Sequence, residues 1–351
     1  MTPDLLRIID ANFNRSREAL RVMEEYARFV LDDKAATEQL KSLRHELTAA
    51  INTMAPVGQR LAARDTPGDV GTSLTVSAEQ HRADALAVFD SAAARLAESL
   101  RALEEFGKVI DPQTAARLEA CRYRSYELGR KLAFVGRRHR RLREARLYVL
   151  VTESLCRRDA LETIEQVARA GADIVQLREK SLEDGELLRR AAKATTICRN
   201  HGALFIINDR PDIACLCKAD GVHVGQDDLP VAAVRRIIGP EMLVGLSAHN
   251  LGQLEEAFRQ QPDYVAVGPM FDSATKPQEH IAGPALLAQA ATGTELPIIA
   301  IGGISAENVC QLQPCRPFCA AVCGAVISDP DPAAVVTRLL SVLPGRQAGG
   351  G

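Results

Sequence analysis

The feature that most limits the fold is a regular alternation that begins near Ala145. Short apolar runs are each followed by a stretch of helical character, and eight such pairs fill the chain as far as Leu343. Repeated strand–helix pairs are typical of parallel sheets, and their number favours a closed (β/α)8 barrel over an open doubly wound sheet. The runs are Leu147–Val151, Ile174–Leu177, Leu204–Ile207, Gly221–Val224, Leu243–Leu246, Tyr264–Val267, Ile298–Ile301 and Ala320–Ile327.

The first 135 residues show helical periodicity and almost no strand signal. Residues 15–26 are echoed by residues 95–106, and both segments obey R-x-x-E-[AS]-L-R-x-[ML]-E-E-[YF]. This repeat predicts a duplicated helical unit around a shared core. We therefore expect an α/β TIM barrel preceded by an all-α domain. The expected order is a helical domain at 1–135, a basic solvated linker at 136–144, the barrel at 145–343 and a disordered tail at 344–351.

Composition narrows the setting of the chain. The net charge of −2 over 351 residues gives no global reason to expect a nucleic-acid or membrane partner. No signal peptide opens the sequence, and no apolar run approaches the ~20 residues of a membrane span. We expect a cytoplasmic protein whose nine cysteines stay thiols, and the oligomeric state, a homo-oligomer included, is left open. Four late cysteines lack the C-x-x-C spacing of a zinc site, so they are expected in the core: Cys310, Cys315, Cys319 and Cys323.

Polar residues follow several of the apolar runs, where a parallel barrel places its active site. Arg178 and Lys180 come after the second run and Lys276 after the sixth, and three cations suit a substrate with several negative charges. Asp209 and Asp228 follow the third and fourth runs and suit Mg²⁺ shared with substrate phosphates. Taken singly, the cations fit an exposed strand end and the acids fit helix caps. Their common end of the barrel favours a joint site.

The seventh and eighth runs carry a second anion-binding signal. Gly302-Gly303 and Ser328 predict a phosphate site built from backbone N–H groups, with a plain tight turn as the alternative. His223 and His249 also fall at the predicted mouth, where hydrogen-bonded histidines and catalytic ones remain equally open. The site is thus expected to have two halves, one metal-assisted and one formed by backbone.

Six motifs in order connect these residues to a known family. The strings are Q-L-R-E-K, I-N-D, G-V-H-V-G-Q-D-D-L, G-L-S-A-H, G-P-x-F-x-S-x-T-K and A-I-G-G-I. Along essentially the whole barrel, the chain resembles thiamine phosphate synthase. The resemblance implies that hydroxymethylpyrimidine diphosphate and a thiazole phosphate, two small-molecule substrates, form thiamine phosphate and pyrophosphate with Mg²⁺ as cofactor. It also implies that the C–O bond to diphosphate breaks early and that the thiazole nitrogen attacks the resulting pyrimidinylmethyl cation.

The resemblance further implies a role for each matching residue. Catalysis would be electrostatic, with Arg178, Lys180 and Lys276 stabilising the leaving group. Asp209 and Asp228 would bind Mg²⁺. The pyrimidine diphosphate would contact Gln176, Arg178, Lys180, Asn208, Ser247 and Lys276. The thiazole phosphate would contact Ser273, Thr275, Gly303, Ile327 and Ser328.

The helical domain carries a resemblance of its own. Its strings R-I-I-D-A-N-x-N-R-x-R-E-A-L-R-V-x-E-E and A-R-D-T-P-G-D-V-G-T are similar to the domain, often labelled ThiD2, that precedes some bacterial thiamine phosphate synthases. This implies a hydroxymethylpyrimidine phosphate kinase that supplies the barrel's substrate, although no P-loop is present. Candidate phosphate or metal ligands, for which surface ion pairs are the alternative, are Arg15, Arg21, Arg64, Asp65 and Asp69.

Two rival functions fit the same fold. A TenI-like thiazole tautomerase needs one phosphate site and has no use for the Arg178, Lys180 and paired-aspartate set. A non-catalytic sensor of thiazole or thiamine phosphate would bind these ligands without releasing pyrophosphate.

Overall fold

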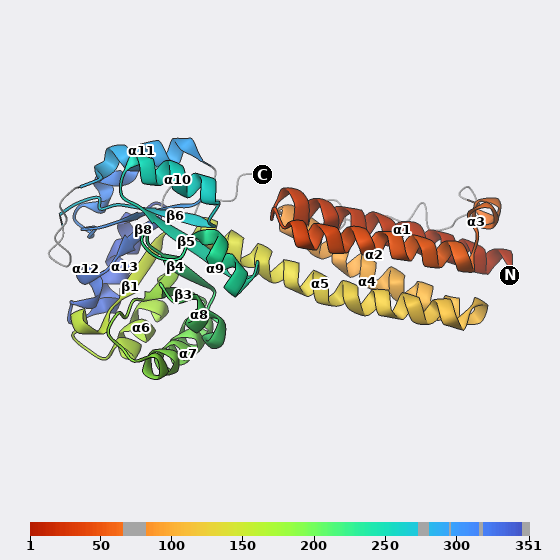
Figure 1. The fold of residues 1–351 in the computed structure, drawn as a ribbon, viewed down its shortest axis with the longest axis horizontal. Coiled ribbons are helices and arrows are strands. Elements are labelled where there is room, and N and C mark those ends of the chain that lie inside the picture. Colours follow the sequence, from red (N-terminus) through yellow and green to blue (C-terminus); the bar gives the residue numbers. More distant parts are fainter. Residues whose placement is uncertain (66–81, 273–280, 295, 316–318, 346–351) are drawn as a thin grey trace. The chain divides into compact units, whose positions relative to one another are not determined.

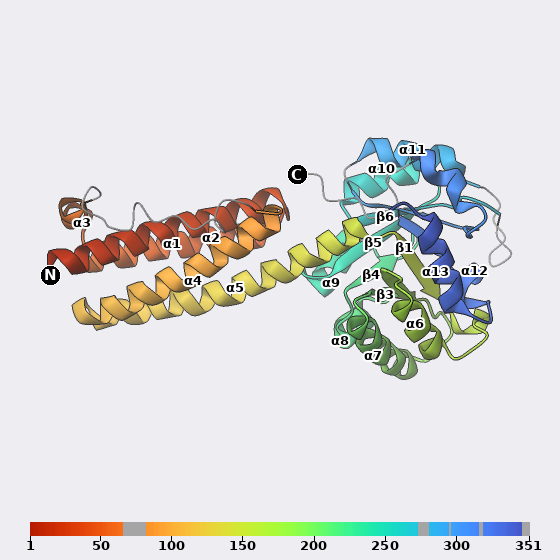
Figure 2. The ribbon, with the colours of Figure 1, turned by 180° about the vertical axis from the view of Figure 1, so that it is seen from behind.

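The computed structural model describes residues 1–65, 82–272, 281–294, 296–315 and 319–345. The chain divides into two compact units between Arg137 and Arg138 (Figures 1 and 2). Each unit is described by itself below. The expected tail lies almost entirely outside the described residues.

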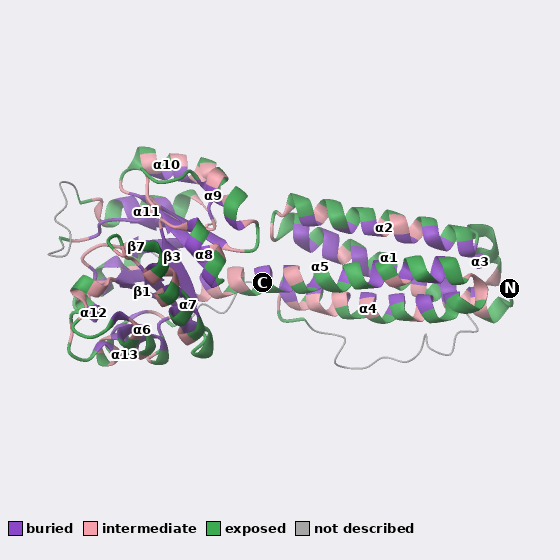
Figure 3. Cartoon of the chain, turned by 60° about the horizontal axis from the view of Figure 1, so that its bottom comes forward, coloured by how far each residue is buried: buried purple, intermediate pink, exposed green. Residues whose placement is uncertain are grey.

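The first unit is helical throughout its described part. Its elements are α1 (Pro3–Phe29), α2 (Lys34–Met54), α3 (Val57–Ala63), α4 (Ala85–Ile110) and the larger part of α5 (Pro112–Glu144). The side chains of Thr2, Asp33 and Asp84 accept hydrogen bonds from the first free N–H groups of α1, α2 and α4, as expected of N-cap residues. Each long helix buries one stripe of side chains and exposes the opposite face (Figure 3). The shared core includes Leu20 from the first repeat and Leu100 from the second.

The repeat in the sequence corresponds to a duplicated pair of helices. In the first copy, Glu24 of α1 accepts a hydrogen bond of 3.1 Å from Nε of Arg44 on α2. In the second copy, Glu104 of α4 accepts one of 2.8 Å from Nε of Arg122 on α5. Both carboxylates are buried. The repeated glutamate is therefore a structural residue that joins each helix to the next, because a buried carboxylate needs a charged partner.

The structure differs from the expected linker at 136–144. These residues form the last part of α5. Nε of Arg138 lies 3.0 Å from Oδ1 of Asp220, and Arg141 donates to the carbonyl of Gly202. Leu142 is buried in the core of the second unit. The basic side chains alternate with packed ones at helical spacing, so the segment belongs to a folded element.

The second unit is a closed barrel whose eight strands pair in sequence order, each parallel to the next. This confirms the predicted fold class. The strands are β1 (Leu147–Val151), β2 (Ile174–Leu177), β3 (Leu204–Asn208), β4 (Gly221–Val224), β5 (Leu243–Ala248), β6 (Tyr264–Val267), β7 (Ile298–Ile301) and β8 (Cys319–Val322). The outer helices are α6 (Ala160–Arg169), α7 (Asp184–Asn200), α8 (Pro211–Cys217), α9 (Val231–Ile238), α10 (Leu251–Gln260), α11 (Gly283–Gly293), α12 (Gly324–Ile327) and α13 (Pro332–Val342), with 3₁₀ turns at Glu153–Leu155 and Val309–Cys315.

Side chains alternate between the two faces of each strand. Val149 and Val151 of β1 pack among the outer helices, whereas Tyr148 and Leu150 fill the barrel interior. The ring of Tyr264 occupies the space beside Gly245, where a Cβ would lie 2.1 Å from the ring carbon Cζ. Glycine at position 245 therefore makes room for a buried tyrosine in the centre of the barrel.

The eighth predicted strand is wrong in its second half. β8 ends at Val322, and residues 324–327 form the short helix α12. Ile327 and Ser328 thus lie at the end of a helical turn instead of at a strand end. Val326 and Ile327 are both buried, so the apolar character that suggested a longer strand comes from packing of this turn.

The nine cysteines are all free thiols. Cys319 is buried and Cys315 and Cys323 are partly buried, whereas Cys310 is exposed, contrary to the expectation of a core residue. Among the residues that the structure describes, no cluster of three or more His, Cys, Asp or Glu could hold a metal ion. None of the described helices combines the length and the apolar character needed to cross a membrane.

Candidate functional site

Three predicted residues meet at the carboxyl ends of β2, β3 and β4. Nζ of Lys180, after β2, lies 3.2 Å from Oδ2 of Asp209, which directly follows β3. Burial raises the pKa of Asp209, Lys180 lowers it, and the neighbouring carboxyl group of Asp228, after β4, raises it further. The structure therefore places one ammonium and two carboxylates side by side, as the sequence predicts.

The local backbone explains why both acids face this site. Asp209 has a left-handed φ of 61°, and its N–H donates to the carbonyl of His223 at 2.8 Å. The following helix α8 has Arg210 at its N-cap position and no side-chain cap, so Asp209 is not a helix cap. Asp228 accepts from the N–H of Gly225 at 2.7 Å, which fixes one of its oxygens in the turn.

This pair of carboxylates fits a hard divalent cation. Oxygen ligands suit Mg²⁺, which usually takes one or two carboxylates and fills its remaining positions with water and substrate phosphate. Burial and the neighbouring Asp228 both raise the pKa of Asp209, so a bound cation would favour its charged form. A cation held by Asp209 and Asp228 would supply compensating charge.

Arg178 lies at the same mouth, at the end of β2. The backbone N–H of Arg178 donates to the carbonyl of Val151 at 2.9 Å. Its backbone carbonyl accepts from the hydroxyl of Thr152 at 2.9 Å. The next residue, Glu179, accepts from the N–H of Glu153 and so ties the turn after β2 to the turn after β1. The guanidinium of Arg178 itself forms no hydrogen bond or ion pair with any described residue, which leaves it available to an anionic ligand.

A chain of buried polar groups crosses the barrel below this mouth. Nε2 of Gln176 donates to the hydroxyl of Tyr148 at 2.7 Å, and that oxygen lies 3.2 Å from the hydroxyl of Tyr264. The hydroxyl of Tyr264 lies 3.2 Å from Nδ1 of His223, whose Nε2 lies 2.9 Å from Oγ of Ser247. The chain thus connects β2, β1, β6, β4 and β5.

The direction of these hydrogen bonds follows from their first member. An amide nitrogen only donates, so the hydroxyl of Tyr148 accepts from Gln176. Among the described residues its own hydrogen has one acceptor, the hydroxyl of Tyr264, and this fixes the direction of their hydrogen bond. Burial lowers the pKa of His223 to about 4, so its ring is neutral at pH 7. Tyr264 then donates to Nδ1, and the Nε2–H of His223 donates to Ser247. This order leaves the hydroxyl hydrogen of Ser247 free to donate.

Gln176 completes the complementary half of this arrangement. Its side chain is buried, and its Oε1 has no hydrogen-bond partner among the described residues. A buried carbonyl without a donor costs about 1–3 kcal/mol, so a ligand donor at this position would be stabilising. This chain of hydrogen bonds therefore presents one free acceptor, at Gln176, and one free donor, at Ser247.

Two further polar residues sit at the mouth. Asn208 ends β3 and is nearly buried, yet its carboxamide forms no hydrogen bond with a described residue. His249 is held by its ring, since Nδ1 lies 2.8 Å from the carbonyl of Gly268. Both predicted histidines are therefore hydrogen-bonded, and His223 serves the interior chain.

The turn after β7 packs tightly against the turn after β6. Gly303 has a φ of 66°, and a Cβ there would lie 2.4 Å from the carbonyl oxygen of Asp272 and 2.6 Å from that of Phe271. Only glycine fits this close approach. Three predicted contacts that follow Asp272 lie outside the described residues: Ser273, Thr275 and Lys276.

The remaining predicted phosphate contacts belong to α12. The backbone N–H of Ile327 donates to the carbonyl of Cys323, and that of Ser328 donates to the carbonyl of Gly324. The hydroxyl of Ser328 donates to the carbonyl of Leu155 at 3.1 Å. These groups are already hydrogen-bonded within the protein, because a helical turn stands where a strand end was expected.

The two tyrosines of the interior hydrogen-bond chain are not among the residues that the sequence motifs select. Tyr148 and Tyr264 each lie in an apolar run, where an aromatic residue reads as core. The one available signal was that tyrosine carries a hydroxyl that needs a partner when buried.

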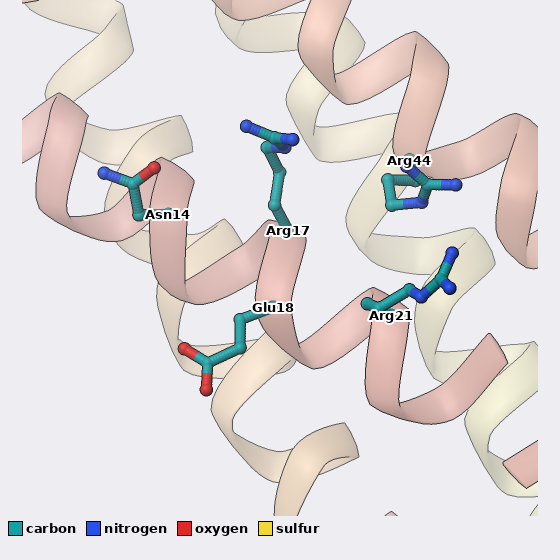
Figure 4. Close-up of a pocket in the computed structure, with 5 residues that line it drawn as sticks. All are labelled: Asn14, Arg17, Glu18, Arg21 and Arg44. Atoms are coloured by element: carbon teal, nitrogen blue, oxygen red, sulfur yellow. The ribbon is translucent and has the colours of Figure 1, made fainter. Parts of the chain in front are cut away.

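The helical unit contains two polar clefts along α1. The larger, of about 590 Å³, is lined by Asp4, Arg7, Ile8, Asp10, Ala11, Asn12, Asn14, Arg15, Arg64 and Asp65. The smaller, of about 310 Å³, is lined by Asn14, Arg17, Glu18 and Arg21 of α1 and by Arg44 of α2 (Figure 4). Three of the predicted ligands therefore lie in the larger cleft and Arg21 lies in the smaller one. The fifth, Asp69, lies outside the described residues.

Arg21 also has a structural explanation. Its Nε lies 2.9 Å from Oε1 of Glu25, and its Nη1 lies 3.6 Å from Oε1 of Glu24. In the second copy, Arg101 contacts Glu104 and Glu105 in the same way, both at 2.8 Å. The helix-surface alternative therefore accounts for Arg21.

Comparison with known proteins covers both units. Residues 147–326 match the family model described as thiamine monophosphate synthase, and residues 7–131 match the ThiD2 family. A thiamine-phosphate synthase of Rhodopirellula baltica is 43% identical over 320 residues, covering 88% of this chain and 84% of the relative. One of Synechocystis sp. is 37% identical, covering 97% of this chain and 96% of the relative.

A solved structure agrees with the barrel alone. Thiamine phosphate pyrophosphorylase from Pyrococcus furiosus superposes with a TM-score of 0.53 and 26% identity, covering 57% of this chain and 96% of that one. Family model, full-length relatives and structure all point the same way. The chain belongs to the thiamine monophosphate synthase family.

Proposed function

We propose that the barrel condenses hydroxymethylpyrimidine diphosphate with a thiazole phosphate to give thiamine phosphate and pyrophosphate. The observation that carries the proposal is the meeting of Lys180, Asp209 and Asp228 at one mouth of the barrel. An ammonium beside two carboxylates suits a diphosphate that arrives with Mg²⁺. The relatives that match along nearly the whole chain carry the name of this activity. The cytoplasmic location stays a prediction, which cell fractionation would test.

The interior polar chain supports recognition of an aminopyrimidine. The edge of such a ring offers an amino group that donates and a ring nitrogen that accepts. Oε1 of Gln176 is the free acceptor, and the hydroxyl of Ser247 is the free donor. Asn208, with an unpaired carboxamide at the mouth, would add a contact nearer the diphosphate.

Departure of the diphosphate is the step for which the basic residues are suited. Arg178, Lys180 and Lys276 would stabilise the negative charge that develops as the C–O bond breaks, and the thiazole nitrogen would then attack the pyrimidinylmethyl cation. Preorganised charges of this kind typically contribute on the order of 10²-fold each to the rate. Mg²⁺, when bound by Asp209 and Asp228, would supply further electrostatic stabilisation of the leaving oxygens.

The thiazole phosphate would occupy the other half of the mouth. We assign it to Ser273 and Thr275 after β6 and to Gly303 after β7, with Ile327 and Ser328 as the contacts from α12. The close packing of Gly303 against Asp272 supports this assignment, since it holds the two turns together. The phosphate would have to compete with the hydrogen bond from Ser328 to Leu155.

We assign a hydroxymethylpyrimidine phosphate kinase activity to the helical domain at 1–135, ahead of the synthase domain at 145–343. The match to the ThiD2 family over residues 7–131 supports this role. The product of such a kinase is the diphosphate that the barrel uses. The isolated chain should then consume ATP when hydroxymethylpyrimidine phosphate is added.

The deciding experiment mixes the purified chain with both substrates and Mg²⁺. Thiamine phosphate and pyrophosphate should appear in equal amounts, and EDTA should stop both. A tautomerase would convert a thiazole isomer without pyrophosphate, and a sensor would bind ligands without turnover. Folded protein that releases no pyrophosphate would reject the synthase assignment.

A further inference from the structure

The helical unit contains two copies of one helix pair, so α1 and α4 can be compared position by position. The comparison distinguishes residues that both copies use for packing from residues that only one copy carries. From Leu5 to Phe29 each position of α1 has a counterpart in α4, and several residues of the shared core recur in both copies. Leu20 and Leu100 are both fully buried, and Glu24 and Glu104 both accept an arginine from the next helix. A side chain present in one copy alone needs another explanation.

At four positions α1 carries a polar side chain where α4 carries alanine. The pairs are Arg7 and Ala87, Asn12 and Ala92, Asn14 and Ala94, and Arg17 and Ala97. All four polar residues line the two clefts along α1. Because α4 is helical with alanine at these positions, helix formation does not require the four polar side chains.

The larger cleft is prepared for a ligand by a buried acid. Asp10 is 6% exposed, and its Oδ2 lies 2.7 Å from Nη2 of Arg64. Nε of Arg60 lies 3.7 Å from its other oxygen, and the Arg60 guanidinium lies over the ring of Phe13 at 4.6 Å. Asp10 thereby holds two arginines against α1: Arg60, which lies in α3, and Arg64, which directly follows it. A fixed guanidinium loses less entropy on binding an anion.

Two side chains of this cleft are unpaired within the described residues, whereas Nδ2 of Asn12 donates to the carbonyl of Ile8 at 3.0 Å. Neither the carboxamide of Asn14 nor the guanidinium of Arg15 forms a hydrogen bond or ion pair with a described residue. Arg7 makes one long contact, 3.4 Å from Nη2 to the carbonyl of Asp65. Figure 4 shows Asn14, Arg17 and Arg21 in order along α1, with Arg44 of α2 beside Arg21, so the polar surface continues into the smaller cleft.

We propose that the larger cleft binds a small organic phosphate. Arg7, Arg15 and Arg64 would hold the phosphate, since guanidinium groups match its oxygens, and Asn12 and Asn14 would hydrogen-bond the organic part. The cleft volume of about 590 Å³ suits a small molecule. The choice of phosphate rests on the proposed kinase, whose two substrates are a pyrimidine phosphate and ATP.

A variant that makes the two copies alike tests this directly. It carries Arg7→Ala, Asn12→Ala, Asn14→Ala and Arg17→Ala in the full chain, the residues that α4 already has. Alanine favours the helix, so the fold should persist. Calorimetric titrations would use three probes: inorganic phosphate, hydroxymethylpyrimidine phosphate, and ATP with Mg²⁺. A control that also removes an arginine is Arg95→Ala, since Arg95 lies on α4 and lines neither cleft.

The barrel is unchanged in every variant, so differences in binding report on the helical unit. At least one probe should bind the quadruple variant about tenfold or more weakly, a loss of one charge-assisted contact, while Arg95→Ala binds like the parent chain. Thiamine phosphate synthesis from the diphosphate should not change, because the barrel is untouched, and an unchanged far-ultraviolet circular dichroism signal would show that the helical unit is still folded. Equal binding by parent and quadruple variant, or no binding of any probe to the parent, overturns the proposal. Weakened binding in a chain without kinase activity supports the cleft and rejects the kinase.

Discussion

Nε2 of His223 lies 2.9 Å from Oγ of Ser247, and this contact gives the serine hydroxyl its direction. Burial lowers the pKa of His223 to about 4, so its neutral ring has one N–H to give. Because Tyr264 donates to Nδ1, that N–H is on Nε2 and donates to Ser247. The direction of the Ser247 hydroxyl is therefore set by Tyr264, which is itself two hydrogen bonds away from Gln176.

Replacing Tyr264 with phenylalanine should break this chain at its centre. Tyr264→Phe leaves the hydroxyl of Tyr148 and Nδ1 of His223 without their partner, and each unpaired buried group costs about 1–3 kcal/mol. His223 can then change tautomer. We expect the KM for the pyrimidine diphosphate to rise roughly tenfold with the KM for the thiazole phosphate unchanged. Steady-state kinetics with Tyr123→Phe, an exposed tyrosine, as the control would show this, and equal changes in both KM values would contradict it.

Removing one carboxylate from the mouth should weaken the response to Mg²⁺. Asp228→Asn removes a charge that raises the pKa of Asp209 and removes a ligand of the proposed cation. We expect the Mg²⁺ concentration for half-maximal activity to rise by about ten- to a hundredfold, with partial rescue at high Mg²⁺. Asp227→Asn, the exposed neighbouring residue, is the control. An unchanged Mg²⁺ titration for Asp228→Asn would remove Asp228 from the metal site.

The sequence predicted the barrel because its strands are short apolar runs bounded by turns. Leu147–Val151 and Ile174–Leu177 have the bounds expected of them. The prediction failed at Ala320–Ile327, where apolar residues continue through Gly324 into a buried helical turn. Periodicity does not separate a short buried strand from a short buried helix, so tertiary packing alone decides there.

The candidate site was predictable to the extent that strand ends decide it. Lys180, Asp209 and Asp228 lie together because parallel strands end at one mouth. The interior chain was not predictable in this way. Tyr148 and Tyr264 are 116 residues apart, and their hydrogen bond depends on the barrel's closure and on the space that Gly245 leaves.

Adding one methyl group at Gly303 should disturb the thiazole half of the site. In Gly303→Ala the new Cβ would overlap the carbonyls of Asp272 and Phe271, so the turn after β6 must move. We expect the KM for the thiazole phosphate to rise at least about tenfold. Gly202→Ala is a matched control, because Gly202 also has a positive φ, of 74°, but nothing lies within 4 Å of its Cβ position. Both variants bear the backbone strain, and the change in KM should appear in Gly303→Ala alone.

The two copies in the helical unit contain equivalent buried ion pairs, so the loss of stability on removing one can be compared with the loss on removing the other. Glu104→Gln removes the buried carboxylate that contacts Arg122, whose side chain is 8% exposed, and leaves it the more distant Glu119 at 3.8 Å. Glu24→Gln removes the carboxylate that contacts Arg44, whose side chain is 19% exposed. Removing one partner of a buried ion pair costs about 3–5 kcal/mol, and the cost falls with exposure. Urea unfolding at pH 7 should therefore show a larger loss for Glu104→Gln than for Glu24→Gln.

Acid should erase the effect of Glu104→Gln. Burial alone would raise the pKa of Glu104, but Arg122, Lys108 and Arg101 together hold it below the usual value of 4.5. A carboxylate whose pKa is lowered by folding stabilises the native state above its unfolded pKa, and this contribution is lost as pH falls through the folded pKa. The difference in unfolding free energy between parent and Glu104→Gln should be constant from pH 7 to about pH 5 and shrink below pH 4.5. A difference that stays constant down to pH 3 would mean that the carboxylate's charge does not stabilise the helical unit, and that the repeated glutamate acts through packing alone.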